Sequence, residues 1–484
     1  MKGNTAKKNS SSNLLEQYHK LGNQGQLILQ LLAIQVDNCS KSKLAQCLSG
    51  LKIKGIVLDK VSPVLVGKIV TPLEQKGLVI KTKFGLRCPD TLRPHVVLHA
   101  LKTKEFKPLA ERVQKILPLE ERYYGEGRDF TNPDQVLREM QIAGFTGRSA
   151  GTLLSIAYKA GQWFVLDEEG NDPFKRMLPH DMLEQFLPYM AEPTSIFLLQ
   201  NILEWAMDTY HPHTSDYYKT LVTLQRSRIK KKEDCTPLLT IILLRGDCEQ
   251  AGFFLQKKPW PEPYEQLAYS GWLAFITGDN QLAIDTFARA LALYKKLERK
   301  RKTFLPDYPG VFHTLALIKS GDPLLMQQAY DQILLMDKDK RSYADLLVSW
   351  KKVLERQLGL PPNKKKNTSY SSHFMMKLNG TDVILQRLPL VWLDSKELKR
   401  NAKQLENIKV RASLSGFLWP AALAAELLAA AGVQRKINLA YCRELQTGMG
   451  TVGLTDMVEE KPEWEAGLEA IINLAKGGAA GKAK

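Results

Sequence analysis

The chain has 484 residues, a net charge of +17 and a hydrophobic fraction of 44%. A chain of this length and composition can bury a hydrophobic core, which excludes a wholly disordered protein. The values are typical of a globular protein with roughly two to four domains. The charge favours a polyanionic partner, nucleic acid before an acidic membrane surface. The first 100 residues hold 15 Lys and Arg against 5 Asp and Glu, a balance of +10 out of the total of +17. We therefore expect a polyanion at the N-terminal fifth, with a solubilising surface as the alternative.

The six cysteines indicate neither a metal centre nor a disulfide framework. They form no C-x-x-C pair and no Cys/His cluster with the spacing of zinc ligands. We interpret them as reduced thiols of a cytoplasmic protein and expect no metal and no cofactor. The polar, basic start of the chain lacks the apolar segment of a secretory signal. The most apolar run, 416–433, contains a proline and a glutamate, which favours a packed helix over a membrane span.

The chain begins with a polar tail, residues 1–13, and then turns helical. Residues 25–35 carry apolar side chains all round, which predicts a buried helix. Residues 40–51 start with a serine suited to an N-cap and place their leucines on one face. Residues 52–60 predict a connection with a short strand-like centre.

A third helix is expected within VSPVLVGKIVTPLEQKGLVI, residues 61–80. Ser62 can cap its start, Pro63 suits its first turn, and Gly77 suits a C-terminal cap in the left-handed region. Pro72 removes one helical hydrogen bond, so we expect it to kink or divide the helix.

Residues 78–88, LVIKTKFGLRC, predict a strand, a tight turn and a second strand. Three helices followed by a basic two-stranded wing is the order of a winged helix, in which the third helix enters the major groove and the wing touches phosphates. Such a module can also serve only as a protein-docking domain, and that alternative stays open. The residues expected to contact double-stranded DNA are Lys60, Ser62, Lys68, Lys81, Lys83 and Arg87.

The stretch from about 100 to 360 predicts helices, for example at 134–145, 181–191 and 195–210. Gly-Asp pairs recur within it, and two of them share the same downstream pattern of alanines. We interpret this as tetratricopeptide-like helical hairpins, with glycines in the turns and alanines at close helix contacts; a generic helical bundle is the alternative. The residues assigned to this packing are Gly271, Gly278, Asp279, Ala283, Phe287 and Ala290.

The run KKLERKRK, 295–302, is either a solvated helix end or a second nucleic-acid contact. The last third of the chain predicts a linker, strand character at 374–390, and an amphipathic helix at 461–477. The predicted domain organisation is a tail at 1–13, a winged helix at 14–100, a tetratricopeptide-like region at 101–357, a linker at 358–372, a small C-terminal α/β segment at 373–476, and a tail at 477–484.

Catalytic signatures are not found in the sequence. It has no G-x-S-x-G elbow, no H-E-x-x-H and no G-x-G-x-x-G after a predicted strand. The tail sequence GAAGK lacks the full phosphate-loop pattern and its flanking strand and helix. We therefore predict that the chain is not an enzyme, although a site assembled from dispersed residues is the rival possibility.

Several segments, taken in order, resemble a known region. They are LEQKGLV, REMQIAGFTGR (138–148), PEWEAGLEAIINLAKG (462–477) and, most specifically, GWLAFITGDNQLAIDTFARALALYKKLERKRKTFLPDYPGVFHTLALIKSGDP (271–323). Together they resemble the long N-terminal, non-motor region of bacterial Swi/Snf-type helicase-like proteins of the DEAD/DEAH-box kind. In that family a two-lobed ATPase motor that tracks along double-stranded DNA follows this region.

The resemblance implies association with DNA but carries over no ATP-site residue, because the motor motifs are absent from this sequence. It leaves three interpretations: the accessory half of a split system with a separately encoded helicase-like motor, a truncated product, or a stand-alone relative. The expected protein is mainly α, with a winged helix, tetratricopeptide-like hairpins and a C-terminal α/β segment. Its expected function is non-catalytic DNA binding and partner docking in the cytoplasm, without a membrane; a protein–protein scaffold that binds no nucleic acid is the alternative.

Overall fold

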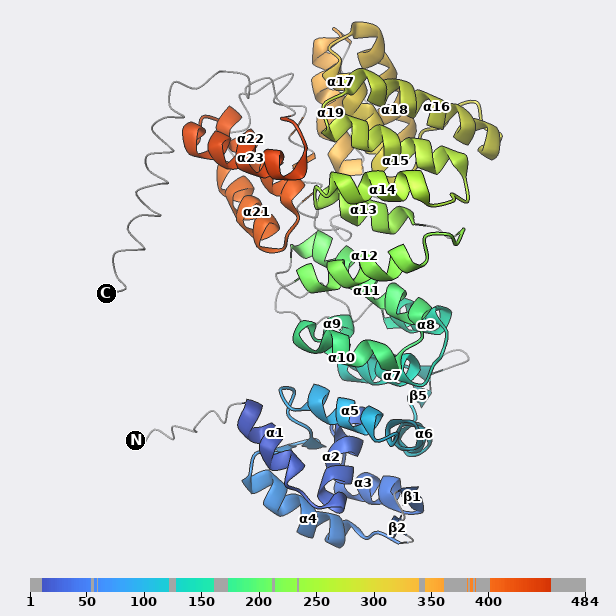
Figure 1. Cartoon of the computed structure of the whole chain (residues 1–484), viewed down its shortest axis with the longest axis vertical. Coiled ribbons are helices and arrows are strands. Elements are labelled where there is room, and N and C mark those ends of the chain that lie inside the picture. The colour runs from blue at the N-terminus through green and yellow to red at the C-terminus, as the bar shows by residue number, and fades with distance from the viewer. Residues whose placement is uncertain are drawn as a thin grey trace, which may run out of the picture. The chain divides into compact units, whose positions relative to one another are not determined.

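The computed structural model describes residues 11–53, 56–58, 60–121, 128–160, 173–210, 214–232, 235–338, 344–360 and 401–453, together with positions 381, 384, 385 and 388. The protein is mainly α-helical, as predicted (Figure 1). The chain divides into two compact units, residues 1–229 and residues 230–484, and each is described by itself. The domain ranges expected from the sequence stay predictions.

In its described residues the first unit consists of helices with three short strand pairs. Its elements are α1 (Ser11–His19), α2 (Asn23–Gln35), α3 (Lys41–Leu48), β1 (Leu51–Ile53), β2 (Ile56–Leu58), α4 (Pro63–Gln75), β3 (Ile80–Thr82), β4 (Gly85–Arg87), α5 (Arg93–Lys102), α6 (Phe106–Ile116), β5 (Glu120–Glu121), β6 (Arg128–Asp129), α7 (Pro133–Phe145), α8 (Ala150–Ala160), α9 (Pro173–Met177), η1 (His180–Met182), α10 (Leu183–Phe186), η2 (Leu187–Tyr189), α11 (Glu192–Thr209) and α12 (Ser215–Ser227). Each pair, β1–β2, β3–β4 and β5–β6, is antiparallel.

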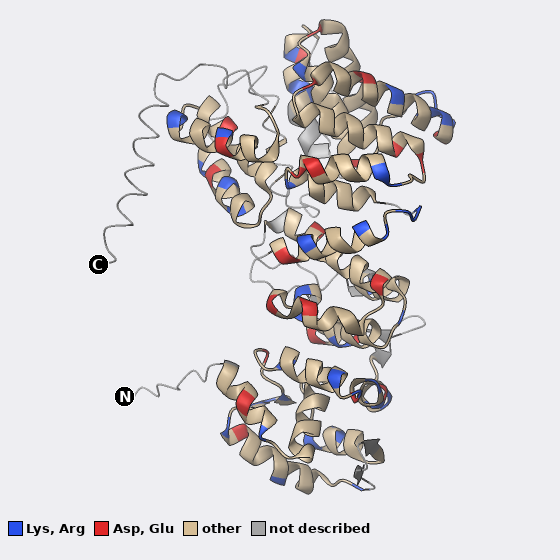
Figure 2. Ribbon diagram, in the orientation of Figure 1, with Lys and Arg blue, Asp and Glu red and all other residues tan. Residues whose placement is uncertain are grey.

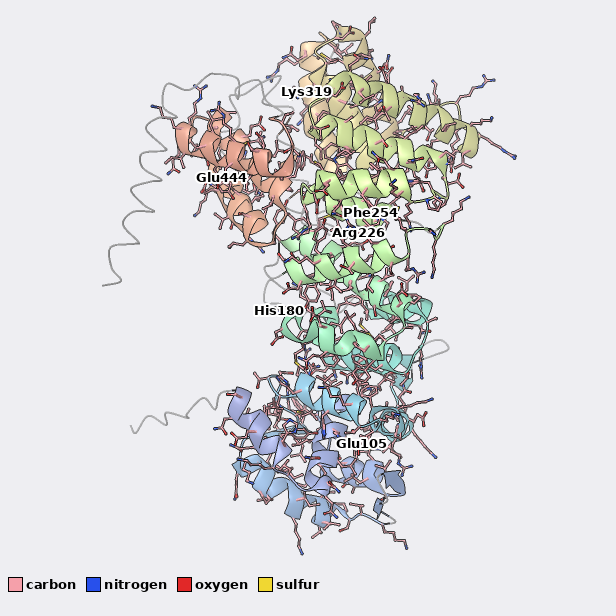
Figure 3. All side chains as sticks on the ribbon, in the orientation of Figure 1. Glu105, His180, Arg226, Phe254, Lys319 and Glu444 are labelled. Carbon is pink, nitrogen blue, oxygen red and sulfur yellow. The ribbon has the colours of Figure 1, made fainter. Side chains whose placement is uncertain are left out.

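Helix α2 is the centre of this unit, and it is buried on all sides as its apolar sequence predicted. It is buried because α3, α4, α5, α6 and α7 all pack against it. The polar side chain of Gln30 is accommodated there because its Nε2 donates to Glu105 Oε2 at 2.9 Å. Glu105, labelled in Figure 3, also accepts a hydrogen bond from Thr103 Oγ1 at 2.7 Å.

Side chains of α7 reach back to the C-terminal end of α2. The Nε2 atom of Gln141 donates to the carbonyls of Ala33 at 3.2 Å and Ile34 at 2.8 Å. These carbonyls lie in the last turn of α2, where no intrahelical donor is available. The side chain of Asn132 donates to Asp37 Oδ2 at 2.8 Å just beyond that turn. The helices that follow the hairpin β3–β4 are therefore tied to the core of the first unit.

The prediction of one helix at 181–191 was wrong. The backbone there forms three short pieces, η1, α10 and η2, and only α10 is α-helical. Pro188 lies within η2, and a proline cannot donate the hydrogen bond that an α-helix needs at that point. The predictions at 134–145 and 195–210 correspond to α7 and α11.

The second unit is built of helices throughout its described part. These are α13 (Thr236–Leu244), α14 (Cys248–Lys257), α15 (Pro263–Ile276), α16 (Asn280–Glu298), α17 (Asp307–Lys319), α18 (Pro323–Lys338), α19 (Ala344–Gln357), α21 (Ala402–Leu414), α22 (Leu418–Ala430) and α23 (Arg435–Met449). Consecutive helices from α13 to α19 pack on their neighbours, and α21, α22 and α23 pack on one another (Figure 1).

An aromatic cluster fills the core between α15 and α17. The Trp272 ring is fully buried and stacks on Phe312, with ring centres 4.4 Å apart. Tyr269 and Tyr308 contact the same indole at 5.8 Å and 5.7 Å. Large rings of this kind contribute much of the buried apolar area of a helical core.

The expected C-terminal α/β segment contains helices and no strand within its described residues. Residues 401–453 form α21, α22 and α23, and positions 381, 384, 385 and 388 have helical backbone as well. The strand character expected at 374–390 is therefore wrong at these four positions, since a short apolar run does not by itself distinguish a strand from a helix. The remaining residues of that run, most of the linker at 358–372, the helix expected at 461–477 and both tails, apart from residues 11–13, lie outside the described residues.

Helix α22 is almost wholly buried, as the apolar run at 416–433 predicted for a packed helix. In the part of the chain that the structure describes, no helix combines the length and the apolar character needed to cross a membrane.

Candidate nucleic-acid interface

Helix α4 begins and ends at the residues that the sequence predicted. The Ser62 hydroxyl caps its start by accepting a hydrogen bond from Leu65 N at 3.2 Å. At the other end Gly77 has φ +73°, and Leu78 N donates to Leu73 O at 2.9 Å. This is the Schellman arrangement, in which a left-handed glycine lets the chain reverse and satisfy the last carbonyls.

Pro72 was expected to kink or divide this helix; the division is wrong, and the kink stays a prediction. Helix α4 runs without a break from Pro63 to Gln75. Pro72 lies in the last turn, so its missing N–H leaves only the carbonyl of Lys68 without an intrahelical donor. The neighbouring carbonyl of Gly67 accepts a hydrogen bond from Thr71 Oγ1 at 2.8 Å. One lost bond near a helix end is not enough to stop the helix.

The hairpin β3–β4 was also predicted correctly. Ile80 pairs with Arg87 and Thr82 pairs with Gly85, which leaves Lys83 and Phe84 as a two-residue turn. The Thr82 hydroxyl accepts a hydrogen bond from Phe84 N at 3.1 Å and therefore fixes the turn from within.

A third, one-residue strand completes this hairpin. Cys39, in the connection between α2 and α3, exchanges two main-chain hydrogen bonds with Leu86, each 2.9 Å long. A Cβ atom on Gly85 would lie 2.8 Å from the carbonyl oxygen of Cys39, so only glycine allows this approach. The wing is therefore anchored to the helical core at its base. A single paired residue has no periodicity, so apart from the glycine no pattern in the sequence indicates this pair.

Most of the residues expected to contact DNA are available to solvent. Ser62 lies at the start of α4, Lys68 lies in its middle, and Lys81 and Lys83 lie on the wing. The exposed members of the predicted set are Lys60, Ser62, Lys68, Lys81 and Lys83.

Arg87 differs from the other predicted contacts because it is half-buried and already paired. Its Nη2 atom forms an ion pair with Asp90 Oδ2. Asp90 also lies 3.4 Å from Arg176 Nη2 and 3.8 Å from Arg93 Nε. A phosphate would have to compete with Asp90 for the Arg87 guanidinium.

The surface around α4 and the wing is strongly basic. Residues 60–87 hold six Lys and Arg and a single acidic residue, Glu74. Figure 2 marks on the ribbon where the Lys and Arg residues and the Asp and Glu residues occur along the described elements. The sequence missed one further cation: Lys41 of α3 extends toward Gly67 of α4, and its Nζ would lie 3.5 Å from a Cβ placed there. Lys41 is exposed and adds a positive charge beside α4.

The cysteines of the first unit are buried thiols. Burial raises the pKa of Cys39 to about 12, that of Cys47 to about 11 and that of Cys88 to about 12. A thiol with a raised pKa is a poor nucleophile and a poor metal ligand at neutral pH. Over the described residues, no three His, Cys, Asp or Glu side chains are placed to hold a metal ion.

The residues assigned to repeat packing lie where α15 meets α16. A Cβ atom on Gly271 would lie 2.9 Å from the ring of Phe287, which is fully buried. Ala283 and Ala290 are also fully buried on α16. Gly278 and Asp279 form the turn between the two helices.

The Gly-Asp pairs lie in three-residue connections between helices, Thr277–Asp279 and Arg245–Asp247. Gly278 has φ +98° and ends α15, while the Asp279 carboxylate accepts from Leu282 N at 2.9 Å and caps α16. Gly246 and Asp247 connect α13 to α14 in the same way, with φ +76° and a 3.2 Å bond from Gln250 N. The glycine supplies the left-handed residue that ends one helix, and the aspartate supplies the N-cap of the next.

The C-terminal helices pack on this array. A Cβ on Gly278 would lie 2.5 Å from Val452 Cγ2, and Val452 N donates to Ile276 O at 3.1 Å. Trp419 of α22 contacts Phe312 of α17 edge to face at 5.4 Å. The Arg245 guanidinium at the end of α13 donates to the carbonyl of Ser415 at 3.1 Å. Part of the array surface is therefore covered by the protein itself.

The basic run 295–302 lies at the end of α16 and just beyond it. Helix α16 ends at Glu298, and Arg299 adopts a left-handed conformation with φ +54°. Residues 299–302 are exposed. The structure therefore leaves both interpretations of this run, a solvated helix end or a second contact with nucleic acid, as predictions.

Comparison of the chain with protein-family models, with curated proteins and with solved structures found no match. The class of this protein is therefore inferred from its residues and their geometry. The resemblance to the non-motor region of helicase-like proteins stays a prediction.

Proposed function

We propose that this protein binds double-stranded DNA through a winged helix and docks a protein partner through its helical array, without catalysis of its own. In this proposal α2, α3 and α4 with the wing β3–β4 form the winged helix. Helix α4 enters the major groove, and the wing lies along the phosphates. The observation that carries the proposal is the set of exposed lysines on α4 and on the wing. They belong to residues 60–87, which contain six basic residues and one acidic residue.

Two features of the geometry support this assignment. The wing is fixed to the core by the Cys39–Leu86 pair, so the backbone that carries its lysines is held in place. The start of α4 is exposed from Ser62 to Leu65, and a helix N-terminus favours an anionic group such as a phosphate. The fixed wing would reduce the entropy lost when DNA binds, and the helix N-terminus would attract a phosphate electrostatically.

Charge reversal with a matched control tests the proposal. We expect Lys81→Glu combined with Lys83→Glu to weaken binding of the full chain to a labelled duplex by at least tenfold, since each lysine is expected to contact a phosphate. The control combines Lys159→Glu and Lys219→Glu, two exposed lysines on α8 and α12. It changes the net charge equally. An equal loss in both variants would show that binding depends on total charge and not on the wing.

The helical array is the proposed docking part, with tetratricopeptide-like hairpins joined by Gly-Asp turns. The resemblance implies a helicase-like motor as the partner. The C-terminal helices already cover Gly246, Gly278 and Phe312, so we place the docking surface on α16. There Leu293 and Leu297 are 41% and 51% exposed.

Replacing both of these leucines with aspartate tests the docking surface. If α16 docks the motor, Leu293→Asp with Leu297→Asp should abolish co-purification with it and leave DNA affinity unchanged. Retained co-purification would show that the motor docks elsewhere.

A protein–protein scaffold that binds no nucleic acid is the second candidate. It is favoured by the apolar first turn of α4, where Val64 is 70% and Leu65 39% exposed. Apolar side chains on that surface fit a protein partner as well as a DNA groove. Undetectable DNA binding at low salt would establish the scaffold over the DNA-binding proposal.

A further inference from the structure

The tip of the wing carries an exposed aromatic ring. Phe84 is 70% exposed, and among the described residues it is the one phenylalanine or tryptophan that lies largely in solvent. The ring lies outside the core, at a surface position that a ligand can reach. Lys83 and Gly85 flank it in the sequence.

The ring projects from a turn that is held rigidly. The Thr82 hydroxyl accepts from Phe84 N at 3.1 Å and donates to Asn38 Oδ1 at 2.7 Å. Gly85 lies against the backbone of Cys39, which leaves the base of the turn no room to shift. A ligand that contacts Phe84 therefore meets a preorganised group and loses little entropy on binding it.

A cation accompanies the ring. The Nζ atom of Lys83 lies 4.8 Å from the centre of the Phe84 ring. Lys81 is exposed two residues earlier on the same hairpin. A flat apolar face beside two positive charges matches a nucleotide, which combines a flat base with a phosphate.

We infer that Phe84 stacks on a nucleobase that is already unstacked, so that this protein prefers DNA with an unpaired base to fully paired duplex. This inference rests on the proposed DNA binding. Wedging a side chain into an intact stack requires that a base step be unstacked first, which weakens binding. Stacking on a free base has no such cost and strengthens binding by roughly tenfold. A two-residue turn with a single ring fits stacking on an unpaired base better than insertion between stacked bases.

The test compares two short duplexes that differ only in one unpaired central base, with the full chain as the binding protein. The unpaired position carries 2-aminopurine, whose fluorescence falls when an aromatic ring stacks on it. We expect the wild type to bind the duplex with the unpaired base about tenfold more tightly, with quenched fluorescence. Phe84→Ala should abolish both effects while its affinity for the paired duplex stays unchanged. Phe84→Trp should keep both.

The variant Phe84→Leu separates stacking from simple apolar contact, because leucine is apolar but has no flat ring. It should behave like Phe84→Ala. Equal affinity of the wild type for both duplexes, or an unchanged preference in Phe84→Ala, would overturn the inference and leave DNA binding in place. Failure to bind either duplex would overturn the proposed function and this inference with it.

Discussion

Cys39 and Leu86 exchange both of their main-chain hydrogen bonds, each 2.9 Å long, although 47 positions separate them in the chain. This pair joins the wing to the connection between α2 and α3 and makes the hairpin part of the core. The position of the wing relative to the helices is therefore set by backbone pairing and not by side-chain contacts alone. Two residues carry this arrangement: Leu86, which is buried, and Gly85, which permits the close approach.

The first prediction concerns Gly85. In Gly85→Ala the new Cβ would lie 2.8 Å from the carbonyl oxygen of Cys39, a backbone atom that cannot rotate away. We expect the Cys39–Leu86 pair to open, with a loss of about 2 kcal/mol of stability. Hydrogen exchange of the Leu86 and Cys39 amides, which are protected while paired, measures this directly.

The matched control is Gly50→Ala. Gly50 also has a positive φ, +76°, but the nearest atom to a new Cβ there is Arg112 Nη2 at 3.9 Å. This variant shares the backbone strain and lacks the collision, so the Leu86 amide should stay protected. Unchanged protection in Gly85→Ala as well would show that the pair does not depend on the glycine.

The second prediction distinguishes Arg87 from the wing lysines. Because Asp90 already pairs with Arg87, Arg87→Gln should weaken DNA binding less than Lys81→Gln. Conversely, Asp90→Asn should strengthen DNA binding, since it frees the guanidinium. Each effect is measured from the duplex affinity of the full chain. If Arg87→Gln lowers the duplex affinity more than Lys81→Gln does, the prediction is wrong and Arg87 leaves Asp90 to bind DNA.

The third prediction compares two helical glycines of the array. In Gly271→Ala the methyl group would lie 2.9 Å from the Phe287 ring, which is buried and stacked on His313, so we expect a loss of about 1–3 kcal/mol. Gly252, in α14, has no atom within 4 Å of a new Cβ. Gly252→Ala should therefore stabilise the protein by about 1 kcal/mol. Thermal unfolding of the two variants gives both values, and a shift in the same direction for both would contradict the packing described for α15 and α16.

The fourth prediction concerns pH. Burial, reinforced by the charge of Lys295, lowers the pKa of His313 to about 4. The amide nitrogen of Gln332 lies 3.2 Å from His313 Nδ1, which fits an unprotonated Nδ1. An unfolded histidine has a pKa near about 6.5. The unfolded chain therefore binds a proton between pH 6.5 and 4 that the folded chain does not bind, and stability falls as the pH falls across this window.

The size of this effect is about 3 kcal/mol over the whole window. His313→Gln removes the titrating group and serves as the control. Although it also loses the contact with Phe287, its stability should depend less on pH than that of the wild type between pH 6.5 and 4.5. Parallel pH profiles for the two proteins would exclude His313 as the cause.

Local signals in the sequence predicted the local structure. Ser62 and Gly77 mark the two ends of α4 because capping depends on residues within one turn of the helix. The wing followed from a β-favouring segment interrupted by a tight turn. Gly278 and Asp279 indicated a helix junction for the same reason, since each acts on its own neighbours.

Long-range relationships could not be predicted in this way. The pairing of Cys39 with Leu86 and the ion pair at Asp90 depend on how distant segments meet. The contact between Val452 and Gly278 also joins segments that are far apart in the sequence. The glycine in this turn therefore both ends a helix and leaves room for the Val452 side chain. Pro72 does not divide α4, because the missing N–H leaves one carbonyl near the helix end without its intrahelical donor.

The most direct test of the proposed DNA binding is the affinity of the full chain for duplex DNA across a salt series. We predict that the logarithm of the affinity falls linearly with the logarithm of the salt concentration, by about 0.9 for each phosphate contacted. Contacts from Lys60, Lys68, Lys81 and Lys83 would give a slope of about −3.6, and replacing all four with glutamine should remove most of it. No binding at low salt, or a slope unchanged by these four substitutions, would contradict the proposal that α4 and the wing hold DNA.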